Sequence, residues 1–218
     1  MVICYSKVCN VLLIAVRGLK TLFSLMSKIF FTDESLPLKA AFTSPGSVDT
    51  DCSWGKSVWS DDIPPSKSFT TWRFFHNKMP TNEHLQCRGC HLASRCSNCH
   101  TRVETSEHLF LSCSFVVKLW GWLAGILNTN IDTSSIESFF SVCNDQWSPW
   151  VKGVVTIAII HTINAVWFCR NIEIFENKAI SFLQAISRIK ATTSLSGNNS
   201  KLMTYNSVLN FVILRQFN

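Results

Sequence analysis

The stretch CSNCHTRVETSEHLFLSC, residues 96–113, constrains the fold of this chain more than any other. Cys96 and Cys99 form a C-x-x-C pair, a spacing at which one tight turn can aim both sulfurs at a single metal ion. His108 and Cys113 offer two further ligands at H-x4-C spacing. On a continuous α-helix five positions advance about 500°, so these two side chains would diverge by roughly 140°. A helix that carries His108 must therefore end before Cys113.

Three thiolates and one neutral imidazole are typical of a closed structural zinc site, which leaves no open position for catalysis. We expect Thr105 or Ser106 to cap a short turn that carries His108, with residues 109–111 packing inward. The competing interpretation is that these cysteines are ordinary buried thiols of a reduced protein, since free cysteine is among the most buried residue types. Three cysteines and His108 at these spacings within 18 positions favour Zn²⁺ as the bound ion.

Other ligand-type residues lie close to this stretch. A four-cysteine site built from Cys87, Cys90, Cys96 and Cys99 would leave only five residues between the two pairs, against roughly 15–20 in ribbon-type zinc sites. That spacing is cramped, and we therefore favour the set Cys96, Cys99, His108 and Cys113. Whether Cys87, Cys90, His91 or His100 contributes to the site stays open at this stage.

The composition predicts a folded protein. Of 218 residues, 47% are hydrophobic and 16% are charged, which is too apolar for a largely disordered chain. Ten cysteines invite a disulfide-linked, secreted interpretation, but 16 Phe and 8 Trp can build a core without covalent links. We therefore expect an intracellular protein, nuclear or cytoplasmic, rather than a secreted one.

Changes in composition along the chain predict five segments. Residues 1–35 form an amphipathic segment of uncertain origin, in which Lys and Arg interrupt the apolar run too often for a signal peptide or membrane anchor. Residues 36–55, rich in Ser, Pro, Gly and Asp, form a linker. Residues 56–127 form the zinc-binding domain, residues 128–193 a helical spacer, and residues 194–218 a flexible C-terminal segment.

Helical periodicity dominates the zinc-binding segment. Phe69, Trp72 and Phe75 recur at helical spacing and are expected to face the core of a helix that Pro80 stops. A short helix should follow, with Thr81 as its N-cap and Gly89 at its end. A further helix is expected over residues 114–127, with Phe115, Leu119 and Ile126 on one stripe.

The longest predicted helix begins with Ser148 as N-cap and Pro149 at the first helical position, and it stays apolar through Phe175. A membrane-spanning assignment is disfavoured because Arg170 and several other polar side chains would lie in lipid. An amphipathic helix over residues 178–191 follows. No alternating strand pattern occurs, so the predicted class is all-α, without a substantial sheet.

These motifs together resemble the zinc-binding domain found after the reverse transcriptase in plant non-LTR retrotransposon proteins. The resemblance covers residues 38–122, and the helical stretch up to about residue 214 resembles the spacer that precedes a ribonuclease H domain. It implies zinc ligation by Cys96, Cys99, His108 and Cys113, and reverse transcriptase and ribonuclease H domains as neighbours in a full-length element. The other residues that carry it are Trp59, Pro64, Pro65, Trp72, Pro80, Thr81, Leu85, Arg88, Gly89, Glu104, Thr105, Leu109, Phe110 and Trp120.

No catalytic motif accompanies these features. A reverse transcriptase needs paired aspartates in a Tyr/Phe-x-Asp-Asp turn and a ribonuclease H needs a carboxylate cluster, whereas the pair Asp61 and Asp62 lies in a predicted loop before prolines. We therefore expect a protein that is not an enzyme, with no small-molecule substrate and no membrane association.

Two functions fit this sequence. The favoured one is a structural spacer between polymerase and ribonuclease H regions. The alternative is a module that binds RNA or DNA weakly through a basic zinc loop. The basic residues in question are Lys67, Arg73, Lys78, Arg88, Arg95 and Arg102, and they are diluted by Asp61, Asp62, Glu83, Glu104 and Glu107.

Overall fold

The computed structural model describes residues 55–135, 137–142, 147–198, 215 and 217. The chain divides into two compact units, residues 1–51 and 52–218, and every described residue belongs to the second. The predicted amphipathic segment (1–35) therefore lies outside the described residues, as do nearly all of the linker (36–55) and most of the C-terminal segment.

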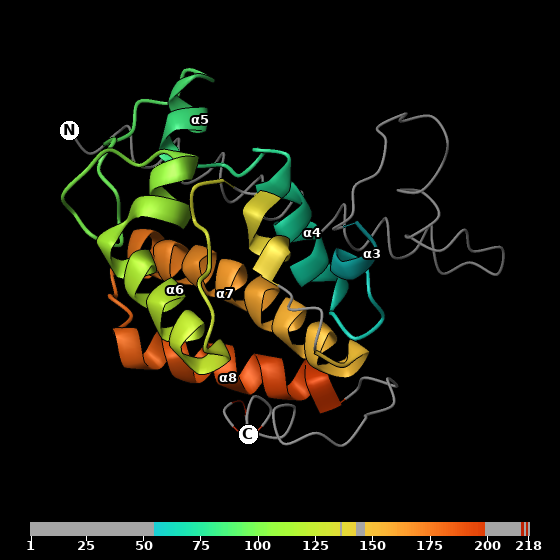
Figure 1. Ribbon diagram of the computed structural model, residues 1–218. Helices are drawn as coiled ribbons and strands as arrows, with labels where there is room; N and C mark the ends of the chain where they lie inside the picture. Colours follow the sequence, from blue (N-terminus) through green and yellow to red (C-terminus); the bar gives the residue numbers. More distant parts are fainter. Residues whose placement is uncertain (1–54, 136, 143–146, 199–214, 216, 218) are drawn as a thin grey trace, which may run out of the picture. The chain divides into compact units, whose positions relative to one another are not determined.

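The described residues are helical (Figure 1). Within these ranges no strand is formed, and the one β-bridge is an isolated antiparallel pairing of Arg95 with Val103. This confirms the predicted all-α class. The elements in chain order are α3 (Gly55–Val58), α4 (Pro65–Phe75), α5 (Asn82–Gln86), the π-helix η1 (His108–Ser112), α6 (Ser114–Leu127), the 3₁₀ helix η2 (Glu137–Val142), α7 (Pro149–Glu176) and α8 (Phe182–Asn198).

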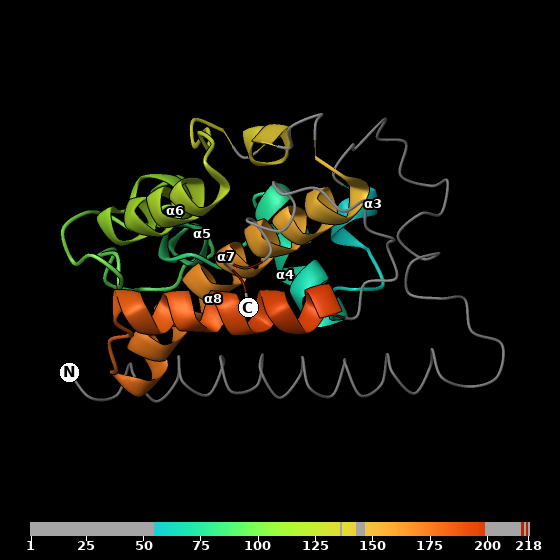
Figure 2. The ribbon, with the colours of Figure 1, turned by 60° about the horizontal axis from the view of Figure 1, so that its bottom comes forward.

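Helix α7 is the centre of this unit. It begins as the sequence predicts, because the Ser148 hydroxyl accepts a hydrogen bond from the Val151 amide and Pro149 is the first helical residue. Helix α8 lies beside α7 in both ribbon views, and α4 and α6 also pack against α7 (Figures 1 and 2). By length and composition α7 could cross a membrane, but 78% of its most apolar stretch is buried inside the protein. That burial is what a core helix shows.

One hydrophobic core joins the two segments that the sequence separates at residue 127. Phe74, Phe110 and Leu119 come from the predicted zinc-binding segment, while Ile159 and Ile163 come from the predicted spacer. All five side chains are almost fully buried in the same cluster. The two segments are therefore packed together as one unit.

The buried face of α4 differs from the predicted one by one residue. Ser68, Thr71 and Phe74 are buried, whereas the expected core positions 69, 72 and 75 are only half-buried. Hydrogen bonds to α7 explain this difference. The Asn164 side chain of α7 donates to the Lys67 carbonyl oxygen (3.2 Å) and to Thr71 Oγ1 (3.1 Å). These hydrogen bonds turn the small polar face of α4 toward α7.

Two helix ends also differ from prediction. Helix α4 stops at Phe75, before Pro80, and Asn77 adopts a left-handed conformation with φ 50°. Helix α8 runs to Asn198, so residues 194–198 are helical and not part of a flexible exit. The physical reason is burial, since Ser196 is 4% exposed and its hydroxyl lies 3.0 Å from Nε2 of His161.

Candidate metal centre

A closed loop presents Cys96 and Cys99. The Cys96 amide donates to the Arg102 carbonyl (2.8 Å), and the His100 amide donates to the Cys96 carbonyl (2.9 Å). His100, directly after the C-x-x-C, takes a left-handed conformation with φ 57°, which lets the chain reverse there. The tight turn that the spacing predicts is therefore present.

His108 and Cys113 come from a widened helical turn. The Thr105 hydroxyl accepts from the His108 amide (2.9 Å), which settles the choice between Thr105 and Ser106 as the capping residue. The Cys113 amide then donates to the His108 carbonyl (2.7 Å), five residues back. This is the hydrogen bond of a π-helix, which is rare and often occurs at functional sites.

The π-turn solves the geometric problem that H-x4-C spacing poses. The helical segment η1 ends at Ser112, and Cys113 is extended with φ −62° and ψ 133°. The predicted end of the helix between His108 and Cys113 is therefore confirmed, and the chain reaches it by widening the last turn. The apolar residues 109–111 between the two ligands are buried, as predicted.

The four ligand-type atoms converge on one point. One atom from each of Cys96, Cys99, His108 and Cys113 lies within 4.8 Å of all the others. The Sγ atoms of Cys96 and Cys113 are 3.9 Å apart, and Cys99 Sγ lies 3.2 Å from His108 Nε2. A tetrahedral ion with Zn–S of about 2.3 Å and Zn–N of about 2.0–2.1 Å requires edges of about 3.8 Å and 3.5 Å. The cluster thus has the size that one tetrahedral metal ion needs.

The cluster is shielded from solvent. Cys96 and Cys113 are fully buried, His108 is 7% exposed and Cys99 is half-buried. Each side chain contributes a single ligand atom, so the four together fill a tetrahedron and leave no position for a substrate. This geometry suits a structural ion.

Hydrogen bonds and burial shift the pKa values of the two buried thiols in opposite directions. The hydrogen bond from Cys96, assisted by the Phe115 and Val116 amides at the start of α6, lowers the pKa of Cys113. The same sulfur–sulfur hydrogen bond and burial raise the pKa of Cys96, although the Cys99 and Asn98 amides oppose that rise. A metal ion binds cysteines as thiolates, so its binding would release protons from this cluster.

The imidazole is held in its metal-binding form. Burial, followed by the nearby charge of Arg102, lowers the pKa of His108, so the ring is neutral at pH 7. Its Nδ1 lies 3.4 Å from the Ser112 hydroxyl, which leaves Nε2 to face Cys99. The Thr101 hydroxyl donates to Cys99 Sγ (3.2 Å). Outer contacts of this kind orient metal ligands.

The rival ligands do not join the cluster. Cys87, His91 and His100 are exposed, and Cys90 is half-buried. Among the residues that the structure describes, Cys96, Cys99, His108 and Cys113 are the only group that could hold a metal ion. The four-cysteine arrangement with Cys87 and Cys90 is therefore not formed. All six cysteines in the described ranges are free of disulfides.

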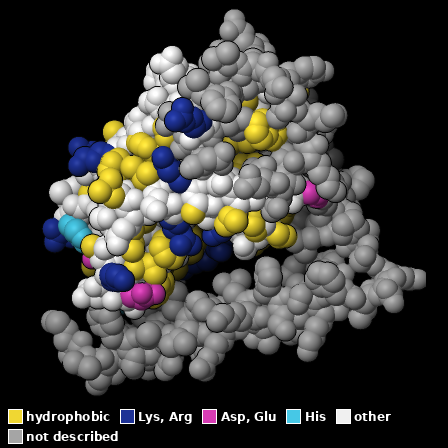
Figure 3. All heavy atoms as spheres, turned by 90° about the horizontal axis from the view of Figure 1, so that it is seen from below, with side chains coloured by type: hydrophobic (Ala, Val, Ile, Leu, Met, Phe, Trp, Pro, Cys, Tyr) yellow, Lys and Arg dark blue, Asp and Glu magenta, His cyan; other side chains and the backbone are white. Residues whose placement is uncertain are grey.

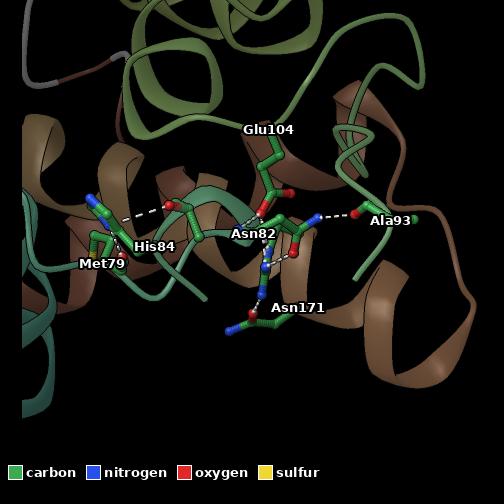
Figure 4. Close-up of polar contacts among 8 residues, drawn as sticks. Met79, Asn82, His84, Ala93, Glu104 and Asn171 are labelled. Carbon is green, nitrogen blue, oxygen red and sulfur yellow. Dashed lines mark hydrogen bonds and ion pairs between the residues drawn. The ribbon is translucent and has the colours of Figure 1, made fainter. Parts of the chain in front are cut away.

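A buried polar network ties the metal loop to α7 (Figure 4). The Arg170 guanidinium donates to Glu104 Oε1 from Nε (3.1 Å) and from Nη2 (2.8 Å), and Nη2 also donates to Asn82 Oδ1 (2.9 Å). Glu104 is 0% and Arg170 3% exposed. The Asn82 side chain donates onward to the Ala93 carbonyl (2.9 Å). Three segments far apart in sequence meet at this ion pair.

Glu104 also replaces the expected cap of α5. Thr81 is the N-cap residue, as predicted, but its side chain caps no amide. Instead the Asn82 amide donates to Glu104 Oε1 (3.0 Å). The negative carboxylate at the helix start is favourable for the same reason that a capping hydroxyl is.

This network was not predicted from the sequence, where Glu104 was placed among the acids that dilute a basic cluster. The structure corrects that assignment, since Glu104 is fully buried. The usable signal was Arg170, a cation within an apolar helix, which requires a buried partner. Nothing in the sequence identifies the partner, 66 residues away.

Comparison with known proteins agrees with the geometry. Residues 38–120 match the family model described as zinc-binding in reverse transcriptase. No curated protein and no solved structure matches the chain. The matched range contains Cys96, Cys99, His108 and Cys113. The match supports a reverse transcriptase zinc-binding domain in this part of the chain.

Proposed function

We propose that the chain is a non-catalytic zinc-binding module of a retrotransposon protein of the plant non-LTR type. The observation that carries this proposal is the closed cluster of Cys96, Cys99, His108 and Cys113, whose ligand atoms lie within 4.8 Å of one another. Such a set binds Zn²⁺ tightly and uses it for stability, because no position is left for water or substrate.

The module acts as a spacer between polymerase and ribonuclease H regions. Two features support this role. The 28 residues of α7 span about 42 Å, and the metal loop is fastened to that helix by the buried pair of Glu104 and Arg170. A rigid unit of this kind sets the separation of its neighbours in a longer protein.

A second function, weak binding of RNA or DNA by the metal loop, is favoured by one observation. Arg88, Arg95 and Arg102 are all exposed around the loop, where they can reach phosphate groups. Glu107 is exposed beside them and weakens the positive potential. Arg95 also donates to the His100 carbonyl, which fixes its side chain.

The metal content of the purified chain tests the zinc proposal. We expect inductively coupled plasma mass spectrometry to find one Zn²⁺ per chain. The ion should be lost in Cys96→Ser and in His108→Ala. The matched control is Cys87→Ser, because Cys87 belongs to the rival C-x-x-C and is exposed. A parent chain without zinc, or ligand variants that keep it, would refute the proposal.

A further inference from the structure

Positive charge is concentrated at the C-terminal end of the sequence. Residues 177–218 contain no Asp or Glu. Their charged residues are Lys178, Arg188, Lys190, Lys201 and Arg215. These residues contribute +5 to the formal net charge of +6, so the rest of the chain carries a net charge of only +1. An acid-free basic segment of this kind attracts an acidic partner.

The fold adds a lysine from α4 to the basic helix α8. Helices α4 and α8 meet the same stretch of α7, since Asn164 binds the Lys67 carbonyl and His161 contacts Ser196. The Arg188 guanidinium lies 3.6 Å from the centre of the Phe168 ring of α7. The pKa of Lys67 is lowered by burial and then by the charge of Arg188.

Neither cation has an acidic partner within the described part of the chain. The buried pair of Glu104 with Arg170 and the approach of Glu173 to His100 (3.7 Å) involve neither of them. Lys67 and Arg188 are both half-buried beside the same stretch of α7. Like charges in such a position repel, and an anion bound near both would offset that repulsion.

The outer face of α8 distinguishes between acidic partners. Leu183 and Leu195 are 74% and 68% exposed, but they are three turns apart, about 18 Å. Exposed Ser187 and Ala191 lie between them on the same face. In Figure 3, Lys and Arg side chains border scattered apolar patches and few acidic side chains appear. A membrane-binding helix needs a continuous apolar face, whereas a serine hydroxyl between cations suits phosphate oxygens.

We propose that Lys67, Arg188 and Lys190 bind the phosphate backbone of a nucleic acid strand that lies along α8. This inference rests on the second proposed function, that the chain contacts nucleic acid, and it moves the contact from the metal loop to α8. Arg188 and Lys190 lie about 200° apart around that helix, so they flank its exposed face, and Lys67 of α4 adds a third cation on the Arg188 side. Binding through phosphates alone is independent of base sequence and weakens steeply with salt.

The experiment is a fluorescence anisotropy titration of the full chain with a labelled 20-nucleotide single-stranded RNA and with duplex DNA, at several salt concentrations. We expect the triple variant Lys67→Gln, Arg188→Gln, Lys190→Gln to bind at least about tenfold more weakly. Its slope of log affinity against log salt should be shallower by about two, because each lost phosphate contact removes roughly 0.7–0.9. Lys118→Gln, which removes the same charge from an exposed position of α6, should change neither quantity.

A double variant in the same series separates loss of binding from loss of folding. Arg188 packs on Phe168, so its loss could disturb α8, whereas the double variant Lys67→Gln, Lys190→Gln leaves that contact intact. Circular dichroism and metal content equal to those of the parent establish that each variant is folded. The double variant is expected to lose part of the affinity and part of the salt slope, and unchanged binding by a folded double variant overturns the inference.

Three other outcomes also overturn it. If Arg95→Gln with Arg102→Gln weakens binding while the α8 variants do not, the metal loop is the contact and the second proposed function stands alone. If the parent binds neither nucleic acid, that function fails together with the inference. If the parent instead binds vesicles of phosphatidylserine and phosphatidylcholine through the same cations, the partner is a membrane surface.

Discussion

At the scale of single residues, the ion pair of Glu104 with Arg170 is the most consequential contact outside the metal cluster. Both side chains are almost fully buried, so neither charge can be satisfied by water. Glu104 Oε1 accepts from Asn82 as well as from Arg170, while Oε2 is buried without a partner. Removing one partner of such a pair leaves an uncompensated buried charge.

Glu104→Gln should therefore be strongly destabilising. The substitution removes the negative charge and leaves Arg170 buried, so we expect the free energy of unfolding to fall by about 3–5 kcal/mol. Urea denaturation followed by circular dichroism measures this. Glu107→Gln, at an exposed position, should change stability by less than about 0.5 kcal/mol. Equal stability of the two variants would mean that the buried pair is not formed in solution.

His161 makes the stability of the chain depend on pH. Burial, followed by the charges of Lys67 and Arg188, lowers the pKa of His161 to about 4. In the unfolded chain the imidazole has a pKa of about 6.5. Between these values the unfolded state binds a proton that the folded state does not, so the free energy of unfolding falls as pH falls from 6.5 toward 4. Below pH 4 both states are protonated, and this contribution no longer changes.

His161→Gln should remove this dependence. Gln keeps an amide that can reach the Ser196 hydroxyl, but it does not titrate. We expect the parent to lose about 2 kcal/mol more than the variant between pH 7 and pH 4.5. Urea denaturation at both pH values gives the comparison, and all other titrating groups cancel because both proteins share them. Parallel losses in the two proteins would show that His161 is protonated in the folded state at pH 4.5.

At the scale of elements, local signals in the sequence predict helix starts well. Ser148 with Pro149 marks the start of α7, and the C-x-x-C marks its loop, because each signal lies within a few residues of the structure that it produces. The buried face of α4 could not be read in this way. Asn164, 93 residues from Thr71, decides it by a hydrogen bond, and periodicity holds no information about such distant partners.

Helix α8 has a start signal that predicts a measurable contribution. The Ser181 hydroxyl accepts from the Gln184 amide (3.3 Å), and the Gln184 side chain accepts from the Ser181 amide (2.9 Å), which is a capping box. Ser181→Ala should lower the free energy of unfolding by about 1 kcal/mol. Thermal and urea denaturation measure the loss. Ser187→Ala, exposed within the same helix, is the control and should be neutral or slightly stabilising, since Ala is the better helix former.

At the scale of the whole described unit, the metal cluster and the helices share one core. Cys96 and Cys113 belong to the same buried cluster as Phe110 and Ile159. The Phe110 and Trp167 rings lie 6.4 Å apart, so the segment that carries the metal loop rests directly on α7. The sequence located the four ligands correctly as a cluster. It predicted a division at residue 127, and residues on both sides of that position contribute to this one core. Similarity in sequence defines a motif, whereas burial defines a folding unit.

The shared core predicts that the metal-binding segment cannot fold alone. A fragment of residues 55–127 keeps all four ligand-type residues but loses α7, which covers Phe110 and pairs with Glu104. With Zn²⁺ added, we expect this fragment to show little helical circular dichroism and poorly dispersed amide resonances, because its apolar face is exposed and its buried carboxylate lacks Arg170. A fragment of residues 55–198 should be folded under the same conditions. If the shorter fragment instead bound one Zn²⁺ and gave a dispersed spectrum, the metal loop would be an independent domain and α7 with α8 a separable spacer.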